Sequence, residues 1–167
     1  MVLYAIYNPT NQASALLAAN ATTVTAPEVY GGANMPTGYT ASALVSVWKT
    51  TLASLLDAGE QRDRHIDIRR SSIMTVSTEQ SSHTQVTSSL LTPINAKTIY
   101  GDLQAVGGSS VIYSISPRSD EIGAVSFQFG VGTSQSPYRI SITSPQKFSY
   151  KFIGGAILNI WTSGYDF

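Results

Sequence analysis

The chain has 167 residues, the usual size of one domain, and such a length can bury a core without metal ions or disulfides. It contains no cysteine, which excludes disulfides, thiolate nucleophiles and cysteine-ligated zinc sites. Ten basic residues balance ten acidic ones and no basic arm is present, so we expect nucleic acid not to be a partner.

The first 36 residues are expected to form an irregular N-terminal arm. Glu28 is the only charged side chain before Lys49. Residues 2–7 suit a short strand that stops at Asn8-Pro9, and the alanine-rich stretch 12–21 suits a short helix. Glycine and proline mark the remainder as loop. The beginning of the chain has no signal-peptide pattern, and no stretch approaches the roughly 20 apolar residues of a membrane-spanning helix.

An amphipathic helix is predicted over residues 41–58. Apolar side chains recur there at helical spacing, and serine, threonine and lysine take the opposite face. Thr40 suits an N-cap, and Gly59 suits the left-handed residue that follows a helix. The helix residues expected to face either the core or a membrane are Leu44, Trp48, Leu52 and Leu55.

The remaining sequence predicts strands. Residues 57–70 hold charges of alternating sign, which indicates a solvated turn leading into an edge strand at 64–70. Later apolar runs with a period of two are separated by glycine and proline turns. They lie at residues 73–76, 99–100, 111–115, 125–129, 138–142 and 148–161. We therefore predict a mainly β fold: an antiparallel β-sandwich or barrel at 37–167, with the helix packed on it and the arm at 1–36.

Catalytic motifs are sparse. His65 and His83 lack partners at metal-ligand spacing, so we interpret both as solvated surface residues. A triad assembled from distant residues stays open, but no nucleophile-elbow motif supports one. The only adjacent carboxylates, Asp120 and Glu121, suit a solvated turn. We predict that the protein is not an enzyme and uses neither a cofactor nor a metal.

Aromatic residues crowd the last thirty positions of the chain. Two interpretations are open: rings at alternating strand positions fill the core, or they form an exposed patch suited to a half-apolar boundary or a quaternary ammonium. The residues concerned are Tyr138, Phe148, Tyr150, Phe152, Trp161, Tyr165 and Phe167.

The order of these parts resembles the actinoporin-like pore-forming toxins over about residues 41–161. The predicted helix is followed by Arg64-His65-Ile66-Asp67-Ile68, then Gly123-Ala124-Val125, and then the segment Tyr138–Tyr150. The resemblance implies a β-sandwich, a detachable amphipathic helix and a site for a phosphocholine headgroup. The headgroup residues that it implies are Thr143, Ser144, Pro145, Phe148 and Tyr150. The aromatic run that ends the family's segment is replaced here by residues 152–156.

Three functions are consistent with these features. The first is a water-soluble, membrane-binding, pore-forming protein that recognises lipid headgroups through the C-terminal aromatic patch, secreted or extracellular. The second is a self-assembling structural subunit of a virion, phage tail or similar particle, whose uncharged arm pairs with neighbouring subunits by strand addition. The third is a carbohydrate-binding lectin. The expected partners are thus membrane lipid, a second copy of the chain, or a sugar.

Overall fold

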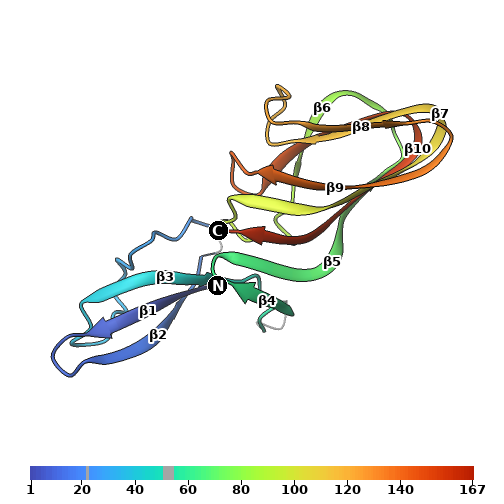
Figure 1. The fold of residues 1–167 in the computed structure, drawn as a ribbon. Helices are drawn as coiled ribbons and strands as arrows, with labels where there is room; N and C mark the ends of the chain where they lie inside the picture. Colours follow the sequence, from blue (N-terminus) through green and yellow to red (C-terminus); the bar gives the residue numbers. More distant parts are fainter. Residues whose placement is uncertain (22, 51–54) are drawn as a thin grey trace.

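In the computed structural model, residues 1–21, 23–50 and 55–167 are described, and they form ten strands (Figure 1). The predicted mainly β fold is confirmed. None of the described residues lies in a helix, and these residues therefore contain no helix that could cross a membrane. The strands are β1 (Val2–Asn8), β2 (Ala13–Ala19), β3 (Ala41–Val47), β4 (Gly59–Arg62), β5 (His65–Val76), β6 (Gln80–Thr87), β7 (Thr98–Ser116), β8 (Val125–Phe129), β9 (Gly132–Ser141) and β10 (Lys147–Asp166).

The predicted helix at 41–58 is wrong. Residues 41–47 form β3, which pairs with β1, and a single bridge joins Thr50 to Leu56. The alternation in Ala-Ser-Ala-Leu-Val-Ser-Val suits a strand, and pairing with β1 outweighs the helical spacing of the apolar residues. Of the four residues expected on the helix face, Leu44 is buried, Trp48 is half-buried, Leu55 is 66% exposed, and Leu52 lies outside the described residues.

The first three strands form a small antiparallel sheet in the order β2-β1-β3. The short helix expected at 12–21 is therefore wrong, because this stretch is β2. The inner face of the sheet buries Val2, Tyr4 and Ile6 under the loop residues 23–40. The hydroxyl of Tyr4 donates to the Pro27 carbonyl at 2.8 Å, which fixes that loop across the sheet. The assignment of residues 1–36 to a separate arm stays a prediction.

The other seven strands form one large, curled antiparallel sheet. Its two longest strands, β7 and β10, pair along most of their length (Figure 1). Strands β5 and β6 follow one another along the far edge of β10, and β9 and β8 do the same along β7. Strand β5 covers residues 65–70 of the strand predicted at 64–70, but β5 lies between β4 and β10 and is not at an edge.

Glycines bend the two long strands at the same level. Gly107 has a φ of 154° and lies opposite Gly155, while Gly154 has a φ of 75°, a value that side-chain-bearing residues rarely adopt. A Cβ atom at Gly107 or Gly154 would collide with the facing backbone. The bends let the sheet curl around its own apolar face.

The interior of the curled sheet holds most of the C-terminal aromatic rings. Tyr138, Phe148, Tyr150, Phe152, Tyr165 and Phe167 are all buried, so the core-filling interpretation is confirmed for them. Trp161 lies half-buried on the opposite face of β10, where the Arg70 guanidinium stacks 3.8 Å from its ring centroid.

The two sheets are joined by specific polar contacts. The Tyr165 hydroxyl donates to the Val47 carbonyl at 2.9 Å, which links β10 to β3 in a buried setting. The Asn95 amide accepts from the Ala26 N–H at 3.0 Å and donates to the Ala26 carbonyl at 2.9 Å. Glu28 pairs with the Arg64 guanidinium, and this contact holds the pKa of the Glu28 carboxyl down at about 2.

Candidate functional site

The predicted headgroup residues fall into two groups in the structure. Thr143, Ser144 and Pro145 are exposed in the turn between β9 and β10. Phe148 and Tyr150 follow in β10, and both rings are buried in the core at 0% and 5% exposure. The structure therefore brings together the turn residues but directs the two rings away from them, into the interior. The headgroup site itself stays a prediction.

His65 belongs to a network that ties three strands together near the end of the chain. Its Nδ1 atom lies 2.8 Å from the Asp166 carboxylate, and its Nε2 atom lies 3.1 Å from the Tyr100 hydroxyl. Burial, followed by the hydrogen bond to Asp67 and then the charges of Asp67 and Asp166, raises the pKa of Tyr100 well above its usual range. A phenol whose pKa is raised stays protonated and is a poor nucleophile. The hydrogen bonds of this network therefore suit a structural role, in which they hold β5, β7 and β10 together.

The interpretation of His83 as a solvated residue is wrong. Its side chain is 1% exposed on β6, and its Nε2 atom lies 2.9 Å from the Ser114 hydroxyl. Glu121 approaches the same nitrogen at 3.9 Å, whereas the buried Nδ1 atom has no hydrogen-bond partner in the described part of the chain. A catalytic triad requires the carboxylate on the other nitrogen and an accessible serine, and Ser114 is 1% exposed. Burial lowers the pKa of His83, so the imidazole is held neutral.

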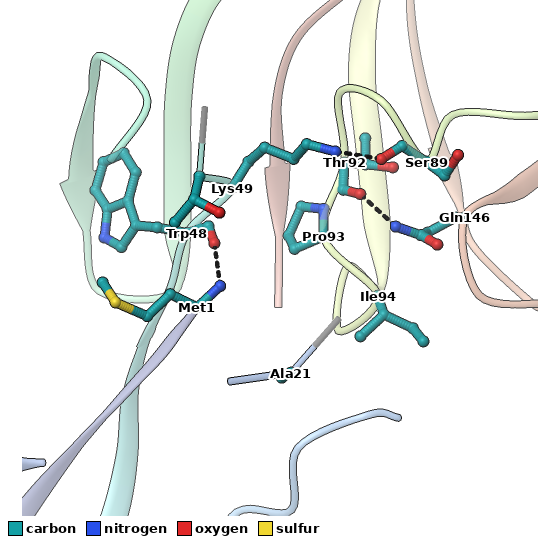
Figure 2. Close-up of a pocket in the computed structure, with 10 residues that line it drawn as sticks. Met1, Ala21, Trp48, Lys49, Ser89, Thr92, Pro93, Ile94 and Gln146 are labelled. Carbon is teal, nitrogen blue, oxygen red and sulfur yellow. Dashed lines mark hydrogen bonds between the residues drawn. The ribbon is translucent and has the colours of Figure 1, made fainter. Parts of the chain in front are cut away.

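A cavity of about 260 Å³ lies at the joint between the two sheets (Figure 2). Lys49 extends across it to the carbonyl oxygen of Ser89, and the Gln146 amide donates to the Thr92 carbonyl at 2.7 Å. Burial lowers the pKa of Lys49. Lys49 and Gln146 already donate hydrogen bonds to main-chain carbonyls. These contacts therefore suit a role in holding the two sheets together rather than in binding a ligand.

The small sheet has an outer face that carries no charge. Opposite residues in the register place side chains of β1, β2 and β3 on this side of the sheet, away from the buried Tyr4. Leu16 is 67% exposed and Tyr7 is 40% exposed, and a shallow groove of about 290 Å³ runs beside Tyr7. The members of this outer face are Leu3, Ala5, Tyr7, Ser14, Leu16, Ala18, Ala41 and Ala43.

Strand β2 is the free edge of the small sheet. It pairs with β1 without a register shift from Ala13 to Ala19, and no other described strand pairs with it (Figure 1). Its sequence, Ala-Ser-Ala-Leu-Leu-Ala-Ala, has no charged residue and no proline. Edge strands in natural proteins are usually protected by lysine, proline or a bulge. By contrast, the opposite edge at β3 is engaged by the loop, since the Leu44 N–H donates to the Glu28 carbonyl at 2.8 Å.

No family model, curated protein or solved structure matches the chain. Sequence reasoning missed β2 as an edge because its alanines and leucines also suit a helix. The signal that was available is the absence of charge from residues 2–27, which leaves both the edge and the outer face neutral.

Proposed function

We propose that the protein is a self-assembling structural subunit whose copies meet through the small sheet. The observation that carries this proposal is the combination of an unprotected, uncharged edge at β2 with an exposed apolar face beside it. An edge of this kind offers unpaired N–H and C=O groups to another strand, and strand addition is a recurring mode of protein association.

Two sources of free energy favour contact at this surface. Main-chain hydrogen bonds across the edge supply direction, while burial of apolar side chains supplies most of the free energy. Full burial of a leucine such as Leu16 contributes about 1.5 to 3 kcal/mol. The formal net charge of zero also limits the repulsion between copies as they approach.

The pore-forming alternative receives less support from the described residues. Its mechanism requires an amphipathic helix that detaches, whereas residues 41–47 are a strand. It also requires rings that reach a lipid headgroup, whereas Phe148 and Tyr150 lie in the core. Pore formation and carbohydrate binding stay predictions.

The proposal is tested by light scattering coupled to size-exclusion chromatography over a range of protein concentrations. The full chain is run with and without phosphatidylcholine/sphingomyelin vesicles that carry a trapped dye. We expect oligomers in the absence of lipid and no release of dye. A chain that is monomeric at every concentration contradicts the proposal, and a monomer that releases dye supports the pore-forming function instead.

A matched pair of variants assigns the contact to the small sheet. Leu16→Lys places a charge at the centre of β2, and we expect it to shift the chain to monomers. Val131→Lys is the control, because Val131 is 86% exposed in the turn between β8 and β9, outside the small sheet. Equal oligomer populations in the two variants would place the interface elsewhere.

A further inference from the structure

We propose that two copies pair β2 with β2 in antiparallel fashion, about a two-fold axis that passes through Leu16. This inference rests on the proposed function and specifies its partner and geometry. The result is a continuous six-stranded sheet in which the β2 edges of both copies are used. Each copy contributes the order β3-β1-β2, so the β2 strands meet in the middle.

The composition of β2 selects a second copy as the occupant. In a two-fold antiparallel contact each residue of β2 lies opposite a residue of β2 in the second copy. A charge on this strand is therefore brought close to the same charge on the other copy. The strand from Ala13 to Ala19 has no charge, and this penalty is absent. With Leu16 at the axis, every other pair of facing residues includes an alanine, so the contact brings together only one pair of large side chains, Leu16 with Leu16.

Symmetry and the side-chain period fix the register. A two-fold axis perpendicular to the sheet keeps the outer face of both copies on the same side, and directly opposite residues in an antiparallel pair point to the same side. Each of Ser14, Leu16 and Ala18 in one copy can therefore lie opposite only one of these same three positions in the second copy. Among the registers that remain, the axis at Leu16 pairs all seven residues of the strand, and any shift leaves residues unpaired at both ends.

The proposed pairing has a consequence for the packing of side chains. Leu16 meets Leu16 of the second copy at the centre of the outer face, and Ser14 meets Ala18. On the opposite face, Ala15 lies beside Leu17, so a small residue accommodates a large one. The two outer faces merge into one apolar surface about twice as wide, and because both edges are used the contact closes as a dimer.

Single cysteines provide the test, since the chain has none of its own. Leu16→Cys, Ser14→Cys and Ala18→Cys are treated with a short thiol-specific cross-linker, alone and as an equimolar mixture of the last two. We expect Leu16→Cys to cross-link to itself, and the mixture to cross-link while neither component does so alone. In the proposed register, position 14 of one copy is about 14 Å from position 14 of the other, because four residues at about 3.4 Å separate them.

Other patterns overturn the pairing. Efficient self-cross-linking of all three variants indicates a parallel strand pair, and self-cross-linking of Ser14→Cys alone indicates a shifted axis. Val131→Cys sets the background from random collision, because its side chain is exposed outside the small sheet. Oligomers by light scattering with only background cross-linking on β2 overturn this inference but leave the proposed function standing. The absence of oligomers removes both.

Discussion

Tyr165→Phe removes a single hydroxyl from the buried joint between the two sheets. The Tyr165 ring is 0% exposed in β10, and its hydroxyl donates to the Val47 carbonyl of β3 at 2.9 Å. Burial raises the pKa of Tyr165, as expected for a phenol held away from water. The substitution keeps the ring and leaves the carbonyl without this donor, so the loss is confined to one polar contact.

The magnitude follows from that contact. A neutral hydrogen bond contributes about 1 kcal/mol, and an unsatisfied buried acceptor costs about 1 to 3 kcal/mol, so we expect unfolding to be easier by about 1.5 kcal/mol. An unfolding entropy of about 2.1 cal/mol/K per residue gives about 0.35 kcal/mol/K for 167 residues, and the thermal midpoint should fall by about 4 °C. The loss of unfolding free energy in Tyr165→Phe is complete below about pH 10. It shrinks at higher pH, because the phenol of the unfolded original chain ionises there and favours unfolding.

The assay is urea unfolding followed by far-UV circular dichroism at one protein concentration. The control is Tyr39→Phe, because the Tyr39 ring is half-buried and its hydroxyl makes no hydrogen bond within the described part of the chain. We expect the control to stay within about 0.5 kcal/mol of the original chain. Equal unfolding free energies for the two variants would refute the assignment of Tyr165 as a link between the sheets.

Two further predictions concern the large sheet. Gly154→Ala should destabilise the fold by about 2 to 3 kcal/mol, because φ is 75° and a Cβ would collide with the Ser110 carbonyl, whereas Gly130→Ala enters open space. Thermal unfolding of both variants tests this, and a similar midpoint for the two would show that β10 does not bend there. The pKa of His83 is lowered by burial, so the unfolded chain binds this proton first and stability falls as the pH drops below about 6.5. His83→Gln keeps a donor for Ser114 and should lose less stability between pH 7.5 and 5.5; an unchanged loss would contradict the buried, neutral imidazole.

Much of the large sheet could be predicted from the sequence. The runs at 111–115 and 125–129 lie in β7 and β8. The second alternates in polarity, the first is apolar except for Ser114, and glycine or proline turns lie near both. This pattern is local, and it identifies a strand without knowledge of its partner. The pairing partners were not predictable, because β10 pairs with β5, β6 and β7 across distances that no local pattern records.

The small sheet was harder to predict, for physical reasons. Residues 41–47 contain apolar positions that satisfy both a helix and a strand, and only hydrogen bonding to β1 decides between them. Residues 13–19 are rich in alanine and leucine, which favour helices in isolation, yet β1 holds them extended. The candidate assembly surface depends on these two segments, so it could not be recognised before the strands were in place.

The position of β10 in the chain has a consequence for the order of folding. This strand contributes most to the large sheet but comes last, so β5 and β7 have no partner between them until residues 147–166 have been synthesised. The strands of the small sheet all lie within the first 47 residues and can pair while the ribosome is still at work. If copies pair through β2 as proposed, neighbouring nascent chains on a polysome present this strand to one another before either large sheet exists, and assembly begins during translation.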